Sequence, residues 1–123
     1  MTIIKDIHSY LKDEGITDIY RSKAPVGVEN VIWIVESPSP APNPAIGYYE
    51  QNLDFWCRFR LTDSGRTALE AIETILHRKE SYDTTNFHVY LSALNNLITD
   101  MGEDIEGRKL YQLSMRFIYR EQS

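Results

Sequence analysis

Two stretches of the chain place apolar residues at the three- and four-residue spacing of an amphipathic helix. In the first stretch, 2–14, the apolar stripe consists of Ile3, Ile4, Ile7, Tyr10 and Leu11. We expect Thr2 to cap this helix and Gly15 to end it. The predicted water-facing side carries Lys5, Asp6, Ser9, Lys12 and Asp13. A second helix is predicted over 63–77, where the basic residues at the end suit the negative pole of the helix dipole.

Other stretches have the patterns of strands. The segment 31–36 (VIWIVE) is apolar at five of six positions, which is typical of a strand covered on both faces. The segments 52–61, 86–94 and 109–120 alternate between apolar and polar residues with the period of two that marks a half-buried strand. The segment 16–20 is short and predicts an edge strand.

The alternation also assigns side chains to the two faces of the sheet. In 52–61 the side chains expected to face the core are Phe55, Cys57, Phe59 and Leu61. Those expected on the opposite face are Trp56, Arg58 and Arg60. In 86–94 the residues predicted to face inward are Phe87, Val89, Leu91 and Ala93. Such half-polar strands indicate a sheet with one face open or covered by another chain.

Two segments interrupt this pattern. The stretch 37–46 has prolines at alternate positions, namely Pro38, Pro40, Pro42 and Pro44. Proline fixes φ and disfavours the α region for the preceding residue, so we expect an extended arm or loop. The stretch 95–108 is acidic and contains two glycines, and we predict an irregular connection there.

Together these elements predict an α+β domain. We expect one domain over 1–123, built from a mostly antiparallel sheet of four to five strands with two helices packed on one face. The helix at 63–77 lies between two pairs of long strands, so it either crosses over between them or makes an antiparallel excursion. No repeat or long linker divides the chain.

Composition and charge narrow the range of functions. The chain has 123 residues and a net charge of −5, so it lacks the basic surface that non-specific binding to nucleic acid requires. No stretch approaches the ~20 apolar residues of a membrane span, so no membrane is expected among its partners. The single cysteine, Cys57, excludes an intramolecular disulfide and a multi-cysteine zinc site.

The candidate residues for catalysis or metal binding are few. Cys57 lies on the apolar side of a predicted strand, where free cysteine is usually buried and inert. His8, His77 and His88 are scattered and lack the spacing of a helical metal site. Glycine-rich phosphate loops and nucleophile elbows are absent from the sequence. We therefore expect no catalytic residue, no metal and no cofactor, and predict that the protein is not an enzyme.

The candidate residues for binding another protein form three groups. Trp56, Arg58 and Arg60 share one strand face, and tryptophan and arginine are typical of interface hot spots. The acidic cluster Asp100, Glu103, Asp104 and Glu106 forms either a solvated loop with Gly102 and Gly107 at positive φ or a surface for a partner, and the candidate binding residues there are Gly102, Asp104 and Arg108. The alternating prolines form the third group, because a stiff extended segment loses little entropy on docking.

The order of several motifs resembles one protein family. These motifs are IYRSKAP, VIWIVES, LDFWCRFRLTDSGRTALEAIETILHRK and MGEDIEGRKLYQLSMRFIYR. Their order resembles the tail terminator family of siphophages, often called phage minor capsid proteins. The matching positions are Gly15, Ile16, Tyr20, Pro25, Phe55, Arg60, Ile75, Leu76, Gly102, Asp104, Gly107 and Arg108. The alternating prolines are not part of this resemblance.

The resemblance implies a structural assembly protein. Members of the family are α+β domains that form a hexameric ring at the head-proximal end of the tail tube, at the tail–head junction of the virion. The ring ends polymerisation of the tail tube protein and meets the head-completion or connector protein, and DNA only passes through its lumen. Assembly in the cytoplasm of the bacterial host is the expected route.

Two alternatives remain open from the sequence. One is another neck component, such as a tail-completion or head-closure protein, because small α+β ring-formers share this composition. The other is a small bacterial enzyme with a cryptic site. A cleft that joins Cys57 to a histidine and a carboxylate would favour the enzyme.

Overall fold

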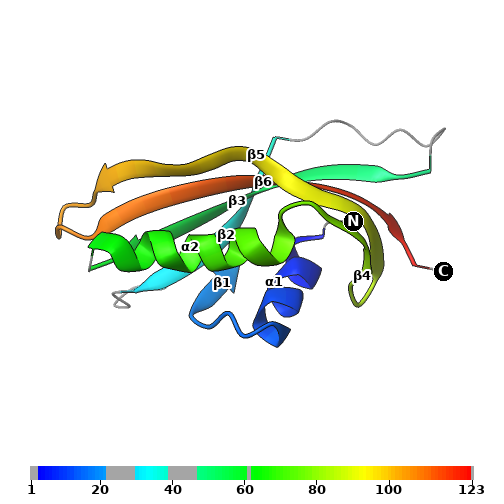
Figure 1. The fold of residues 1–123 in the computed structure, drawn as a ribbon, viewed down its shortest axis with the longest axis horizontal. Coiled ribbons are helices and arrows are strands. Elements are labelled where there is room, and N and C mark those ends of the chain that lie inside the picture. Colours follow the sequence, from blue (N-terminus) through cyan, green and yellow to red (C-terminus); the bar gives the residue numbers. More distant parts are fainter. Residues whose placement is uncertain (1–2, 22–29, 39–46, 61, 123) are drawn as a thin grey trace.

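The computed structural model describes residues 3–21, 30–38, 47–60 and 62–122, and within these ranges the chain forms two helices and six strands (Figure 1). The elements in chain order are α1 (Ile4–Asp13), β1 (Ile19–Arg21), β2 (Val31–Ser37), β3 (Tyr49–Phe59), α2 (Thr62–Leu76), β4 (Lys79–Asp83), β5 (Phe87–Glu103) and β6 (Lys109–Glu121). Neither helix of the described chain is long and apolar enough to cross a membrane.

The strands form one sheet in the order β1-β2-β3-β6-β5-β4. All neighbouring strands are antiparallel except β1 and β2, which are parallel. The predicted α+β class and mostly antiparallel sheet are confirmed, but six strands form instead of four or five. The additional strand is β4, whose sequence KESYD has no apolar alternation and contains Ser81 at a φ of 46°. Pairing with β5, and not local propensity, makes this segment a strand.

β5 is much longer than predicted. The sequence predicted a strand over 86–94 and an irregular connection over 95–108, whereas the strand continues to Glu103. Four register shifts interrupt its pairing with β6. Each shift is a bulge or irregularity that breaks the period of two, and this is why the alternation could not be followed in the sequence.

The first shift changes which face the following residues occupy. Val89 pairs with Tyr119 and Leu91 pairs with Ile118, so Tyr90 is an additional residue on β5. The prediction that Leu91 and Ala93 face the core was therefore wrong, because both are half-buried and Ser92 is fully buried between them. The Ser92 hydroxyl accepts a hydrogen bond from Tyr82 (2.9 Å) and donates one to the carbonyl of Leu76 (2.6 Å). Its polar group is thus satisfied in the interior.

The helices match the predicted boundaries closely, with two corrections at α1. α2 begins one residue before the predicted start and ends one residue before the predicted end. The N-cap of α1 is Ile3, which makes no side-chain capping hydrogen bond, and the predicted cap Thr2 lies outside the described residues. Gly15 follows the end of α1 at a φ of 99°, as expected for a glycine that ends a helix. Asp6, predicted to face water, is buried.

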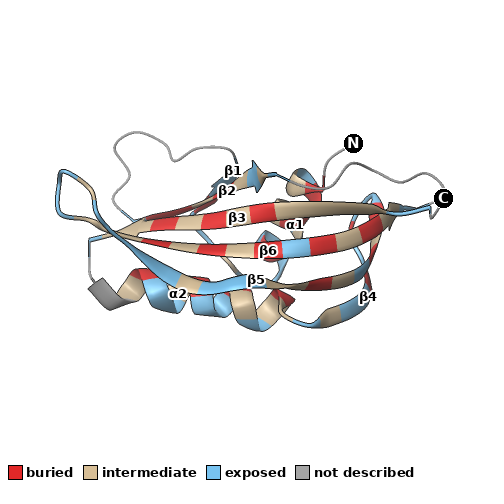
Figure 2. Cartoon of the chain, turned by 90° about the horizontal axis from the view of Figure 1, so that it is seen from above, coloured by how far each residue is buried: buried red, intermediate tan, exposed pale blue. Residues whose placement is uncertain are grey.

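The core lies between the helices and one face of the sheet. α1 contacts β1 and β2, and α2 contacts β3, β5 and β6. The strand positions that face this core are buried in paired rows, such as Cys57 beside Tyr111 and Phe55 beside Leu113. Seen from above, the other face of the sheet is turned toward the viewer and both helices lie behind it (Figure 2). No helix of the described chain covers that open face.

The first turns of α2 approach the sheet closely at Gly65. A Cβ atom at this position would lie 2.9 Å from Sγ of Cys57 and 3.3 Å from ring atoms of Phe59 and Tyr111. Because real Cβ atoms do not approach other atoms that closely, only glycine fits without displacement of its neighbours. Gly65 therefore sets the distance between α2 and β3.

Candidate interaction surface

An aromatic and polar row crosses the open face of the sheet. Cα pairing aligns Tyr20, Trp33, Trp56, Gln112 and Thr99 from β1 to β5. The indoles of Trp33 and Trp56 stack with centroids 6.1 Å apart and an interplanar angle of 13°. Both are half-buried, so their outer ring surfaces remain open to another molecule. Stacked aromatic rings on an uncovered face provide a large rigid contact area.

Next to this row lies a network of uncharged side chains. The Nδ2 group of Asn95 donates to Oδ1 of Asn52 (2.9 Å), and that of Asn96 lies 3.3 Å from Oε1 of Gln112. The backbone N–H of Ser114 donates to Oδ1 of Asn96 (3.0 Å). These hydrogen bonds hold the amides in place on three adjacent strands. The network therefore presents an ordered set of amide groups near the indoles.

The two arginines of the predicted group lie toward one end of β3. Arg58 is half-buried on the open face, opposite Val31 on β2 and Leu110 on β6. Arg60 follows the strand and is exposed; its Nη1 lies 3.4 Å from the carbonyl oxygen of Glu106. Arg60 thus connects the arginine group to the turn between β5 and β6.

That turn is held together by the carboxylate of Asp104. Its Oδ1 accepts hydrogen bonds from the backbone N–H groups of Glu106 and Arg108, both at 2.9 Å. Its Oδ2 accepts one from Nε of Arg108 at 2.8 Å. Gly102 and Gly107 have φ of 87° and 79°, which confirms the positive φ predicted for these two glycines. The turn between β5 and β6 is therefore an internally bonded hairpin tip.

In this acidic segment the side chains of Asp100, Asp104 and Glu106 form ion pairs with Arg108 or Lys109. Desolvation alone would raise the pKa of Asp104, but hydrogen bonds from the backbone and side chain of Arg108 and from the backbone of Glu106 hold that pKa below its ordinary value. The hydrogen bond from Lys109 to Asp100 (2.7 Å) and the N–H of Gly102 lower the pKa of Asp100. Ion pairs and backbone N–H donors therefore stabilise the ionised form of both carboxylates.

The predicted binding residues do not all lie together. Arg60, Gly102, Asp104 and Arg108 belong to one end of the sheet, with Trp56 and Arg58 further along β3. Pro38 lies at the opposite end of β2, where it is exposed and its carbonyl accepts a hydrogen bond from Asn52 (2.8 Å). Pro40, Pro42 and Pro44 lie outside the described residues, so the role predicted for the arm stays a prediction.

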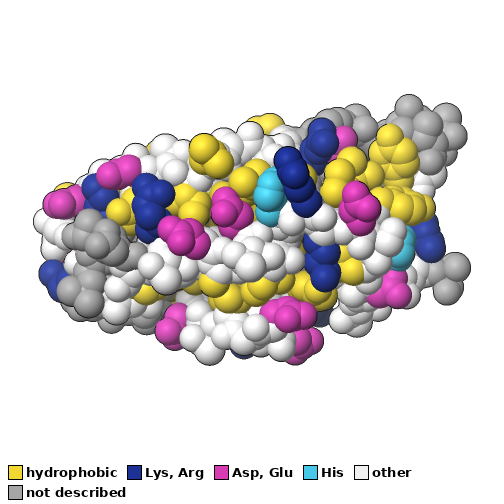
Figure 3. All heavy atoms as spheres, in the orientation of Figure 1, with side chains coloured by type: hydrophobic (Ala, Val, Ile, Leu, Met, Phe, Trp, Pro, Cys, Tyr) yellow, Lys and Arg dark blue, Asp and Glu magenta, His cyan; other side chains and the backbone are white. Residues whose placement is uncertain are grey.

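Sequence reasoning missed several residues of this surface. Trp33 was assigned to a strand covered on both faces, although its indole lies on the open one. The exposed apolar residues Leu97, Met101 and Ile105 were hidden in the stretch interpreted as an acidic connection. Hydrophobic side chains do reach the surface above α2, beside basic and acidic groups (Figure 3). The signal in the sequence was their four-residue spacing, which fits neither a regular strand nor an ordinary polar loop.

The cysteine and the histidines considered as catalytic or metal-binding candidates are buried or hydrogen-bonded within the fold. Cys57 is fully buried, and desolvation raises the pKa of its thiol to about 11. Nδ1 of His77 accepts the N–H of Leu94 (3.2 Å), and Nδ1 of His88 lies 2.7 Å from the carboxylate of Asp83. Within the part of the chain that the structure describes, no three His, Cys, Asp or Glu side chains are grouped to hold a metal ion.

A comparison of the chain with known protein families agrees with the family resemblance seen in the order of the motifs. The bacteriophage tail terminator protein family matches residues 10–121, which reach from the last turn of α1 to the end of β6. No individual curated protein matches the chain. The matched residues include every strand of the sheet, the row that contains Trp33 and Trp56, and the hairpin tip between β5 and β6. The resemblance seen in the motifs is thereby confirmed, and the chain belongs to the bacteriophage tail terminator protein family.

Proposed function

We propose that this protein forms a hexameric ring at the head-proximal end of a phage tail tube. The ring stops addition of further tail tube protein and presents a surface to the head-completion or connector protein. Its role is structural and not enzymatic, and its place is the tail–head junction of the virion after assembly in the host cytoplasm. Family membership supports a structural protein of the phage tail; the ring, its partners and its position are the proposal.

The open face of the sheet is the observation that carries this proposal. With both helices packed on the opposite face, the sheet displays two stacked indoles beside a neutral amide network. Aromatic groups at the centre of a polar, hydrogen-bonded surface are typical of protein–protein contacts. In a ring, each subunit contacts its two neighbours through different surfaces, and the series of contacts closes on itself.

The charge of the chain agrees with a channel for DNA. A net charge of −5 opposes tight binding of the phosphate backbone, because like charges repel and few cations are available to displace counterions. DNA would then move through the lumen without being held. DNA is accordingly a passing molecule and not a ligand in this proposal.

The native mass across a concentration series tests the ring. We expect light scattering to give a mass near six times 14.3 kDa, and electron microscopy of that species to show closed rings. A monomer at all concentrations, or an open helical polymer, would contradict the proposal. Non-annular complexes formed only with a head protein would favour the alternative of a head-closure component.

A matched pair of variants tests the open face. Trp56→Ala removes half of the indole stack, and we expect loss of the high-mass species while the fold remains. Trp56→Phe keeps an aromatic ring and should retain assembly. Circular dichroism and thermal unfolding of both variants separate association from folding. Equal assembly by the wild type and Trp56→Ala would exclude this face as a contact.

A deletion tests the role predicted for the proline segment. Removing residues 39–44 should weaken assembly and leave the fold intact, because a stiff arm contributes to docking and not to the core. Thermal unfolding of the shortened chain is the control for the fold. Normal assembly of the deleted protein would show that the arm is not a contact.

A further inference from the structure

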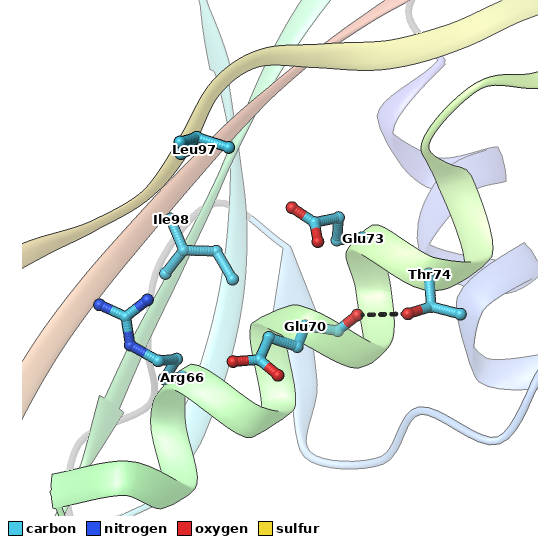
Figure 4. Close-up of a pocket in the computed structure, with 6 residues that line it drawn as sticks. All are labelled: Arg66, Glu70, Glu73, Thr74, Leu97 and Ile98. Carbon is cyan, nitrogen blue, oxygen red and sulfur yellow. Dashed lines mark hydrogen bonds between the residues drawn. The ribbon is translucent and has the colours of Figure 1, made fainter.

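A groove lies between α2 and the distal half of β5. It has a volume of about 340 Å³ and is lined by Arg66, Glu70, Glu73, Thr74, Leu97 and Ile98. Leu97 and Ile98 come from β5, and the four polar residues come from the exposed side of α2 (Figure 4). Ile98 reaches down between the strand and the helix, while Leu97 is 74% exposed. The groove therefore combines an apolar wall with a rim of both charges.

The hairpin tip carries a second unusual feature, a fully exposed isoleucine. Ile105 has a relative exposure of 103% and lies between the tightly bonded residues Asp104 and Glu106. An ion pair between Arg108 and Glu106 (3.1 Å) adds to the hydrogen bonds of Asp104. The turn therefore holds an apolar side chain outward in a fixed position, and a preordered group loses little entropy when it binds.

The tip cannot fill the groove of its own chain. Ile105 lies seven positions beyond Ile98, and the first five of these positions belong to β5, which ends at Glu103; this corresponds to roughly 20 Å at the rise of a β-strand. Any isoleucine that enters the groove in this way must come from another molecule. A projecting group at one place and a receiving groove at another are the two unlike surfaces that a head-to-tail contact requires.

We propose that Ile105 of one copy seats in the α2–β5 groove of the next copy, against Leu97 and Ile98. This inference rests on the ring proposed above and names one contact between its subunits. The polar groups around the two parts are complementary in sign. Glu106 follows the isoleucine, and Nη1 of Arg60 lies 3.4 Å from the carbonyl oxygen of Glu106. The rim of the groove provides Glu70 and Glu73 for this cation and Arg66 for the carboxylate. A central apolar contact inside a polar rim is the arrangement of interface hot spots.

Backbone pairing along the distal edge of β5 is a weaker explanation for these exposed residues. The hydroxyl of Thr99 donates to the carbonyl of Leu97 (2.9 Å), and the N–H of Gly102 donates to Oδ1 of Asp100 (2.8 Å). These local bonds occupy two backbone groups near the tip, and the bulges distort the ladder. Both features are ways in which proteins block strand addition. The side chains, and not the strand edge, are therefore the contact.

Two charged variants and their mixture test the contact. Ile105→Asp destroys the projecting group and Leu97→Asp destroys the groove, and both positions are exposed enough for the fold to be retained. Each variant alone should fall from the mass of the ring to that of one copy. A mixture of the two keeps one intact junction, the tip of the Leu97→Asp copy in the groove of the Ile105→Asp copy. We expect a dimer in sedimentation velocity at high concentration, and no ring.

Conservative variants provide the controls. Ile105→Val and Leu97→Met keep an apolar side chain at each position and should form the wild-type species, and circular dichroism checks that all four variants fold. A native ring of Ile105→Asp, or a mixture that stays monomeric, would overturn this contact and leave the proposed ring untouched. A wild-type chain that is monomeric at every concentration would overturn the proposed ring itself.

Discussion

Asp6 on α1 accepts two hydrogen bonds from Asn86, a residue 80 positions further along the chain. The backbone N–H of Asn86 donates to Oδ2 at 2.7 Å and its side-chain amide donates to Oδ1 at 3.1 Å. The hydroxyl of Thr84 adds a third bond to Oδ2 at 2.8 Å. The carboxylate, which is only 4% exposed, thus fastens the N-terminal helix to the turn between β4 and β5.

Replacing Asp6 with alanine should destabilise the whole domain. The change removes the shared acceptor of three hydrogen bonds, one from the buried Thr84 hydroxyl and two from the partly buried groups of Asn86, and hydrogen bonds to a charged acceptor contribute more than neutral ones. We expect the free energy of unfolding in urea to fall by about 2–3 kcal/mol. The matched control is Asp13→Ala, an exposed acid on the same helix, which should change it by less than about 0.5 kcal/mol. Equal losses of unfolding free energy in the two variants would show that the hydrogen bonds of Asp6 do not stabilise the domain.

Gly65→Ala tests the close approach of α2 to β3. Alanine favours helix over glycine by up to about 1 kcal/mol, but a Cβ atom 2.9 Å from Sγ of Cys57 forces the helix or the strand to move. We expect a net loss of about 1–3 kcal/mol in unfolding free energy. The double variant with Cys57→Ala removes the nearest atom and should show a smaller loss than the sum of the single changes. If the losses in unfolding free energy from Gly65→Ala and Cys57→Ala were additive, the contact with Sγ of Cys57 would not be the source of the strain.

The buried thiol should resist alkylation in the folded protein. With its pKa raised to about 11 and its side chain fully buried, Cys57 has little thiolate and no access to reagent. We expect iodoacetamide at pH 8 to modify the native chain only as fast as it unfolds, and to modify the urea-unfolded chain rapidly. Mass spectrometry at timed intervals measures both rates. Rapid modification of the native protein would contradict this placement.

Acid should loosen the hairpin tip before it unfolds the sheet. The folded-state pKa of Asp104 lies below its ordinary value of 3.8, so its carboxylate stabilises the folded chain fully above that value. This contribution is lost as the pH falls below 3.8 and through the lower folded-state pKa. The amide resonances of Glu106 and Arg108 should move together in this range, because both groups donate to the carboxylate.

The variant Asp104→Asn is the control for this titration. It lacks the titrating group, so the movement of the two amide resonances between neutral pH and pH 3 should disappear. A transition of the wild-type amides with a midpoint above 3.8 would contradict the lowered pKa of Asp104.

The sequence was most informative where one pattern dominated. The periodicity of 63–77 placed α2 to within one residue at each end, and the alternation of β3 and β6 gave the correct faces for residues such as Phe55 and Leu113. In these elements local preference and tertiary packing favour the same structure. The buried Asp6 is the opposite case, because its partners lie 80 residues away and helical periodicity carries no information about them.

The candidate surface was only partly predictable for the same reason. Trp56, Arg60 and the hairpin turn were visible from alternation and turn residues, which depend on neighbours in sequence. The stacking of Trp33 on Trp56 depends on the register of two strands, and the exposure of Leu97 depends on bulges that precede it. Neither a register nor a bulge can be read from local composition.

The four irregularities in the pairing of β5 with β6 also have a mechanical consequence. They follow Val89, Leu94, Asn96 and Asp100 at unequal intervals. If β5 moved along β6 by any number of residues, these bulges would no longer meet the positions that accommodate them. A force applied at the hairpin tip is therefore not relieved by slippage of one strand along the other. It is transmitted along β5 and β6 to the body of the domain.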